Sequence, residues 1–293
     1  MKQELSILIP IFNCDCTEQV AALSCQAEAV TGLSYEIIVA DDGSDNSEFR
    51  IQNSKLSTLP HVRLICRGKN VGRAAIRNFL CKEAKYEWLL FMDGDMGIPT
   101  ENFVRQWLEA DVEQVGYGGY IIGKGETGNL RYMYEKQCEA MHKAKERRKR
   151  PYLHFHTCNF MIRKELMEAH PFDERFRKYG YEDVLFGKQL RKAGIQISHP
   201  DIPAGFFKYE DNAHFVSKTE EGLRTLHEFK NDLRGYSQMI TLTEGIHIGA
   251  VKEIIRLWHR LAGNIERKNL CGKTPSLYVF KLYKLGYFLT LKD

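Results

Sequence analysis

The sequence predicts an α/β protein with a doubly wound sheet, followed by a helical extension. Two observations support this prediction. Apolar segments rich in branched and aromatic residues, typical of interior strands, alternate at short intervals with helical patterns over residues 1–217. From about Lys218 onwards, helical periodicity with basic and aromatic residues replaces that alternation. We therefore expect one α/β domain over residues 1–217 and a helical extension over residues 218–293.

The composition is that of an ordinary globular protein. The 293 residues carry a formal net charge of +4, which is too small to predict a nucleic-acid partner. The eight cysteines lack the paired spacing of a zinc or disulfide framework, so we expect reduced thiols in the cytoplasm. No uninterrupted apolar run approaches the ~18 residues that span a bilayer, and residues 1–4 lead into a strand without a signal-peptide segment. We expect no segment inserted across a membrane.

The chain begins with two predicted strand-to-helix units. The first strand covers residues 5–13, with Pro10 and Phe12 near its end. Thr17 then caps a helix that ends at Gly32.

The second and third strands follow the same pattern. Residues 35–40 form a buried strand that ends in the acidic turn Asp41-Asp42-Gly43-Ser44. Its carboxylates could also cap a helix that begins near Asn46, a role compatible with ligand binding. The third strand, residues 62–66, leads into a loop and helix over residues 70–78 that carry two arginines. Alternating strands and helices of this kind are typical of a doubly wound fold.

The segment after residue 87 carries the most informative pattern. A buried strand over residues 88–92 stops abruptly at Asp93-Gly94-Asp95. Ligands of open α/β sheets bind beyond the carboxyl ends of such strands, and two carboxylates separated by a glycine can converge on Mg²⁺ or Mn²⁺. An acidic turn that caps the helix after residues 99–101 is the structural alternative.

Four segments, each at the end of a predicted strand, resemble the nucleotide-binding half of family 2 glycosyltransferases with the GT-A fold, a Rossmann-like mixed sheet: residues 9–13, 41–44, 70–78 and 93–95. The resemblance implies a nucleoside-diphosphate sugar, with UDP as the expected nucleotide, bound with Mn²⁺ or Mg²⁺ across the strand ends. Independently, an aspartate can accept the uracil N3 proton, and metal-bound carboxylates balance a diphosphate. The donor-binding residues implied are Pro10, Phe12, Asp42, Asn70, Gly72, Arg73, Arg77 and Asp93, with Asp93 and Asp95 at the ribose and metal.

An acidic pair later in the chain supplies a candidate base. Gly180 precedes Glu182 and Asp183, which open an amphipathic helix that runs to Lys192. Acidic residues at a helix start commonly interact with the helix dipole, which is the structural alternative. The resemblance implies instead that Asp183 is the general base and that Glu182, with nearby aromatic residues, holds the acceptor. A single displacement would then invert the anomeric centre, as expected of this family.

Four histidines are further candidates. In many GT-A enzymes a histidine after the acidic pair completes the metal shell or contacts the diphosphate, and His214 is the best-placed match, with His199 as its competitor. His154 and His156 lie in a predicted strand over residues 152–162 and share one face. Without a third ligand nearby, we interpret these two as core or acceptor-cleft residues rather than metal ligands.

The middle of the chain contains two ambiguous segments. After a predicted helix (101–113) and strand (115–122), residues 123–128 satisfy the G-x-G-x-x-G dinucleotide pattern. A true fingerprint needs an acidic residue about 20 positions later, where this chain is basic, so we interpret the segment as a loop beside the sugar rather than a nicotinamide or flavin site. The basic residues 143–150 end a predicted helix that starts near Leu130. They either form a solvated helix end that complements the helix dipole, or attract an anionic acceptor or an anionic membrane.

The helical extension leaves its role open. Its aromatic residues and lysines could lie on a membrane interface, on a subunit interface or in an ordinary core: Tyr278, Phe280, Tyr283, Tyr287 and Phe288, with Lys281, Lys284 and Lys292. Processive members of the family carry a Gln-x-x-Arg-Trp motif and membrane helices, and this sequence has neither. Its absence favours transfer of a single sugar.

Together these features predict a metal-dependent inverting glycosyltransferase for polysaccharide biosynthesis that moves one sugar from a UDP-sugar to a glycan or lipid-linked glycan. We expect a cytoplasmic protein, with peripheral contact at the inner face of the membrane and oligomerisation left open. The alternatives are a sugar-phosphate nucleotidyltransferase, whose glycine-rich basic loop the first strand lacks, and a non-catalytic nucleotide- or glycan-binding module.

Overall fold

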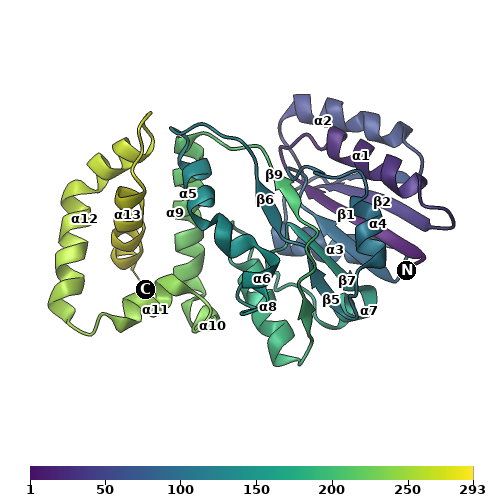
Figure 1. Ribbon diagram of the computed structural model, residues 1–293. Helices are drawn as coiled ribbons and strands as arrows, with labels where there is room; N and C mark the ends of the chain where they lie inside the picture. Colours follow the sequence, from purple (N-terminus) through teal and green to yellow (C-terminus); the bar gives the residue numbers. More distant parts are fainter. Residues whose placement is uncertain (293) are drawn as a thin grey trace.

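The computed structural model describes residues 1–292 as a layered α/β domain with the C-terminal helices gathered on one side (Figure 1). The central sheet is mixed and has seven strands in the order β3-β2-β1-β4-β7-β5-β8, while β6 and β9 pair separately. This confirms the predicted α/β class. The strands are β1 (Glu4–Ile11), β2 (Ser34–Asp41), β3 (Val62–Cys66), β4 (Trp88–Met92), β5 (Val115–Tyr117), β6 (Tyr120–Ile122), β7 (Asn159–Arg163), β8 (Ile197–Ser198) and β9 (Ala204–Phe206).

Helices cover both faces of the sheet because alternate strand residues point to opposite sides. In β1, Leu8 packs in a core with α3 and α8, whereas Ile7 packs in a core with α1 and α4. The α-helices are α1 (Thr17–Glu28), α2 (Ser47–Ser54), α3 (Arg73–Glu83), α4 (Phe103–Glu109), α5 (Leu130–Cys138), α6 (Ala144–Arg147), α7 (Lys164–Ala169), α8 (Glu182–Lys192), α9 (Asn212–Glu228), α10 (Lys230–Leu233), α11 (Gln238–Gly245), α12 (Gly249–Leu270) and α13 (Leu277–Thr290), and short 3₁₀ turns cover Lys55–Thr58 and Glu139–His142.

The strand directions bring several chain segments to one edge of the sheet. Strands β1, β2, β3 and β4 run parallel, so their carboxyl ends meet at that edge. Strand β7 runs antiparallel to β4 and begins there, since Asn159 pairs with Met92. The residues that follow the parallel strands and the residues that precede β7 therefore share one location.

Three predicted elements differ from the structure. The predicted strand over 152–162 forms only at its end, as β7, and the turn before it removes the two-residue period that would align His154 with His156. The predicted strand over 115–122 is divided into β5 and β6 at Gly118 and Gly119, because the second glycine has a φ of +81°. The predicted long helix that ends in the basic segment is broken into α5, a 3₁₀ turn and α6.

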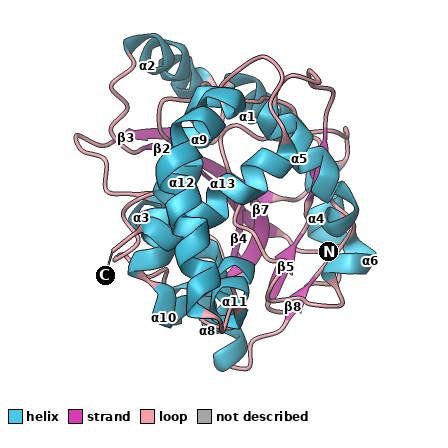
Figure 2. Ribbon diagram, turned by 90° about the vertical axis from the view of Figure 1, so that its left-hand side faces the viewer, coloured by secondary structure: helices cyan, strands magenta, loops and turns pink. Residues whose placement is uncertain are grey.

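The C-terminal helices pack on α9 (Figures 1 and 2). Glu220 of α9 accepts hydrogen bonds from Arg267 of α12, at 2.8 Å, and from the Tyr283 hydroxyl of α13, at 2.7 Å. Phe280 and Tyr283 are buried in this contact, which places them in an ordinary core. The predicted division after residue 217 falls inside α9. Within residues 1–292, no helix is long and apolar enough to cross a membrane.

Gly72 begins α3 in a conformation that favours glycine. Its φ is +94°, and a Cβ atom there would lie 2.6 Å from the backbone oxygen of Arg177. Gly32, after α1, has a similar φ of +79° but nothing within 4 Å of the added atom. Alanine substitutions at the two positions therefore distinguish the cost of backbone strain from the cost of steric overlap.

We predict that Gly72→Ala lowers the free energy of unfolding by about 2–5 kcal/mol, because it adds overlap to backbone strain. Gly32→Ala, the matched control, should lose about 1–2 kcal/mol from strain alone. Urea denaturation of both variants measures the difference, and equal losses would contradict the close approach of residues 72 and 177.

Candidate active site

The donor side of the site is built at the ends of β1 and β2. The buried Asp42 carboxylate accepts hydrogen bonds from the backbone amides of Val71, at 3.1 Å, and Gly72, at 3.0 Å. Burial raises the pKa of Asp42, although these two amides favour its charged form. Phe12, just after β1, is exposed and available to a ligand. The structure thus brings Asp42 and Gly72 into direct contact, with Asn70 exposed in the same loop.

Asp93 follows β4 and is held by two arginines of α3. Arg77 Nη2 lies 2.5 Å from one carboxylate oxygen and Arg73 Nη2 lies 3.0 Å from the other. Burial disfavours ionisation of Asp93, but Arg77 and Arg73 outweigh it and hold its pKa below the usual value. Both oxygens of Asp93 are thereby engaged within the protein.

Glu182 joins the same network from the start of α8. Its buried carboxylate lies 2.7 Å from Arg73 Nε and 3.4 Å from Arg77 Nη1. The two arginines therefore bridge the end of β4 and the start of α8. In this structure the Glu182 carboxylate faces the two arginines.

Asp95 is the open carboxylate of the acidic motif. It is exposed, while Gly94 is buried so closely that a Cβ atom would lie 2.5 Å from the Ile11 side chain. Partial desolvation by the surrounding protein and the nearby Asp93 charge raise the pKa of Asp95. A cation at this position would relieve that unfavourable charge.

The described residues contain no group of three or more His, Cys, Asp or Glu side chains able to hold a metal ion. The predicted trio of Asp93, Asp95 and His214 is therefore not assembled here, because Asp93 is engaged by arginines and His214 is exposed on the first turn of α9. Mg²⁺ is commonly held by one or two carboxylates together with substrate phosphates, so Asp95 alone fits a cation that arrives with a diphosphate.

Asp183 lies on the first turn of α8 and has a hydrogen-bond partner that the sequence did not predict. His156 Nδ1 is 3.0 Å from Asp183 Oδ2, and the Val184 amide donates to Oδ1 at 2.8 Å. Burial opposes ionisation, but the hydrogen bond and charge of His156 outweigh it and lower the pKa of Asp183. The same contact raises the pKa of His156 against its own burial. An ionised carboxylate can only accept, so His156 donates from Nδ1.

Lys218 lines the site without a sequence signal that identified its role. Lys218 of α9 lies 4.9 Å from the Tyr179 ring and is close enough to Asp95 to favour its charged form. The Arg73 guanidinium lies 5.7 Å from the same ring. His214 is one turn before Lys218 on the same helix, so that turn of α9 faces the acidic motif.

The two ambiguous segments have structural roles. In the G-x-G-x-x-G segment, a Cβ atom at Gly125 would overlap the Tyr132 ring, and one at Gly128 would lie 2.5 Å from the Lys273 oxygen. Packing therefore accounts for these glycines. In the basic segment Arg147 is buried and donates to the backbone oxygens of residues 117, 118 and 200. At least this arginine is structural rather than a solvated or ligand-binding charge.

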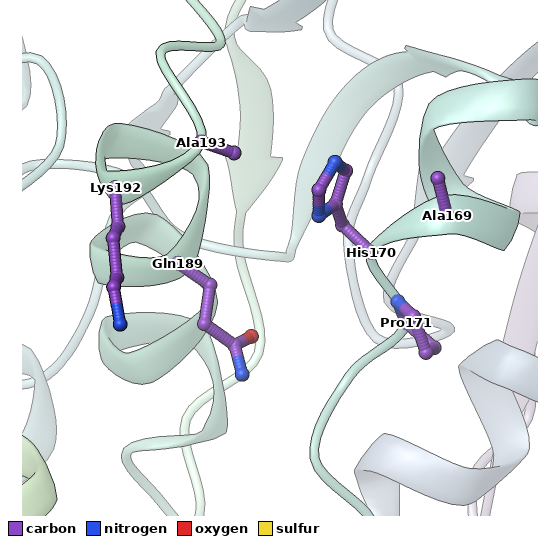
Figure 3. Close-up of a pocket in the computed structure, with 6 residues that line it drawn as sticks. All are labelled: Ala169, His170, Pro171, Gln189, Lys192 and Ala193. Atoms are coloured by element: carbon purple, nitrogen blue, oxygen red, sulfur yellow. The ribbon is translucent and has the colours of Figure 1, made fainter.

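A separate surface pocket lies at the other end of α8 (Figure 3). Gln189 and Lys192 of α8 line one side, and His170 and Pro171 line the other. Gln189 is about 9 Å along the helix from Asp183, by the rise of 1.5 Å per residue. The pocket is therefore distinct from the candidate active site.

Comparisons with known proteins identify the family and the fold. Residues 6–170 match the glycosyl transferase family 2. A chondroitin synthase of Pasteurella multocida is 28% identical over 226 residues, which cover 65% of this chain and 23% of that protein. A poly(ribitol-phosphate) beta-glucosyltransferase of Bacillus spizizenii is 34% identical over 103 residues, which cover 35% of this chain and 16% of that protein. The matched segments span less than half the length of these curated relatives.

Two solved structures share the fold. S. aureus TarS, residues 1–349, superposes with a TM-score of 0.53 at 16% identity and covers 98% of this chain and 89% of that chain. The mannosyltransferase PcManGT from Pyrobaculum calidifontis, in complex with GDP-Man and Mn²⁺, has a TM-score of 0.55 at 12% identity and covers 99% and 85%. The family match and the fold together confirm the resemblance in the sequence. The chain belongs to glycosyltransferase family 2 and has the GT-A fold.

Proposed function

We propose that this enzyme is a metal-dependent, inverting glycosyltransferase that moves one sugar from a UDP-sugar to a glycan or lipid-linked glycan during polysaccharide biosynthesis. The observation that carries the proposal is the arrangement of carboxylates. Asp95 is open at the sheet edge, whereas Asp183 lies on the facing helix with a lowered pKa. One carboxylate suits a cation and diphosphate, and the other suits a proton acceptor.

The donor would bind along the ends of β1 and β2. Phe12 offers an exposed ring for stacking on the nucleotide base. Asp42 is held in place by the Gly72 amide and would accept a hydrogen bond from the base. Asp95 would hold Mn²⁺ or Mg²⁺ together with the diphosphate. A bound cation supplies positive charge that stabilises the departing nucleoside diphosphate. Support for this class of donor comes from TarS solved with UDP-GlcNAc and PcManGT solved with GDP-Man and Mn²⁺.

Asp183 would act as the general base. The acceptor hydroxyl gives its proton to the Asp183 carboxylate while its oxygen bonds to the anomeric carbon, and the bond from that carbon to the diphosphate breaks with its electron pair on the phosphate oxygen. Attack from the face opposite the leaving group inverts the anomeric centre. The lowered pKa keeps Asp183 deprotonated at neutral pH.

His156 and Glu182 would act as positioning residues. His156 donates a hydrogen bond to one oxygen of Asp183 and thereby orients the carboxylate. Glu182 anchors the start of α8 to the arginines that also hold Asp93. The base and the acidic motif are thus linked through the protein. The sequence lacks the Gln-x-x-Arg-Trp motif of processive family members, which supports transfer of a single sugar.

The donor site is tested by calorimetric titration with UDP, GDP, CDP and NAD⁺, each with and without Mn²⁺. We expect UDP to bind tightly only with metal, and Asp95→Asn to weaken that binding at least about tenfold. Asp111→Asn removes an exposed carboxylate near Lys2, away from the site, and should bind as the wild type does. Metal-independent binding of NAD⁺ with no response to the other nucleotides would contradict the proposal.

The base is tested by transfer kinetics of Asp183→Asn, which should lose about 10²–10⁴-fold in kcat. His156→Gln should lose less, and the acid limb of its kcat–pH profile should move to higher pH, because His156 lowers the pKa of Asp183. His154→Gln, the matched control, should keep the wild-type profile. Full transfer by Asp183→Asn would refute its assignment as base, and an unmoved limb in His156→Gln would refute the positioning role.

A further inference from the structure

Helix α12 carries an apolar stripe that the protein leaves uncovered. The α12 stripe consists of Val251, Ile254, Trp258, Leu261 and Ile265, and these side chains are between 39% and 74% exposed. Their spacing of three and four residues places them on one face of the helix. Scattered exposed apolar residues are ordinary, but a continuous row along a 22-residue helix marks an interaction surface.

The opposite face of α12 is already occupied. Gly263 and Glu266 are buried there, and His259 lies against Gly286 of α13. Trp258 donates from Nε1 to Glu266 at 2.8 Å, so its only polar group is satisfied inside the protein. The part of the indole that is exposed therefore presents apolar surface only. Figure 2 shows α12 at the front of the molecule, on the side away from the central sheet.

Positive charge accompanies the stripe. Residues 246–293 contain nine lysines and arginines and three acidic residues, a net charge of +6, whereas the whole chain carries +4. On α12 itself, Arg260 and Lys268 are exposed, while of its two acidic residues Glu266 is buried and Glu253 pairs with Arg256. By helix geometry, Lys268 lies about 60° around α12 from the centre of the stripe, whereas Arg260 lies about 140° away from it. An apolar row with a basic residue beside it, in a segment of net positive charge, is the pattern of a helix that lies in the interface of an anionic bilayer.

We infer that the α12 stripe docks this enzyme on an anionic lipid surface, with α12 parallel to the membrane plane. The apolar side chains enter the acyl boundary, and Lys268 contacts lipid phosphates. A second copy of the chain fits this face less well, because two such surfaces would bring like charges together. The inference does not depend on the donor or acceptor proposed above.

The three tryptophans make the test selective. Trp88 and Trp107 are buried, whereas Trp258 is 51% exposed, so a change in emission on adding lipid reports on α12. The probes are vesicles of phosphatidylcholine alone and vesicles that also contain phosphatidylglycerol. We expect the emission to shift to shorter wavelength, and the full chain to sediment, with the anionic vesicles and much less with the neutral ones.

Variants separate the apolar and charged contributions. Leu261→Gln with Ile265→Gln should weaken vesicle binding roughly tenfold for each side chain, and Lys268→Gln should reduce the preference for anionic lipid. Ile51→Gln changes an equally exposed residue on α2 and should bind normally. Unchanged emission with anionic vesicles would overturn the inference. So would a blue-shifted emission without lipid together with a dimer mass in light scattering, which would identify a second copy as the occupant.

Discussion

A buried ion-pair network organises the site of this glycosyltransferase. Arg77 is almost completely buried, and together with Arg73 it lies between Asp93 at the end of β4 and Glu182 at the start of α8. Leaving one member of such a network unpaired costs about 3–5 kcal/mol, so the four charges persist as a set. The network fixes the distance between the donor side and the acceptor side. The network also distinguishes two neighbouring aspartates, since Asp93 pairs with both arginines and Asp95 does not.

The mixed sheet explains how residues far apart in sequence reach that network. Parallel strands deliver Asp42 and Asp93 at their carboxyl ends, and antiparallel β7 delivers the residues that precede it. The backbone oxygen of Cys158 accepts from the Asp93 amide at 3.1 Å, which joins these segments directly. His156, two residues earlier, thereby comes within reach of Asp183. The α12 stripe lies on the helices away from this edge (Figure 1), so the proposed docking surface is separate from the proposed active site.

Local sequence patterns were sufficient to predict the strands that end in polar turns. Strands β1, β2 and β4 are continuous apolar runs closed by polar turns, and each signal lies within a few residues. The pairing of His156 with Asp183 could not be predicted, because it depends on the direction of β7 and on a turn that periodicity misread as a strand. The position of Arg147 could not be predicted for a similar reason. A run of basic residues predicts solvent-exposed side chains, whereas Arg147 is buried and donates to the backbone oxygens of residues 117, 118 and 200. The resemblance located Glu182, but only the structure shows its partners.

We propose that Asp95 holds the cation while Asp93 stays paired with Arg73 and Arg77. Anomalous diffraction at the manganese edge, from crystals grown with UDP and Mn²⁺, tests it most directly. We expect a manganese peak with Asp95 as its protein carboxylate and with both Asp93 ion pairs intact. A manganese ion bound by Asp93, with the two arginines displaced from that carboxylate, would contradict it.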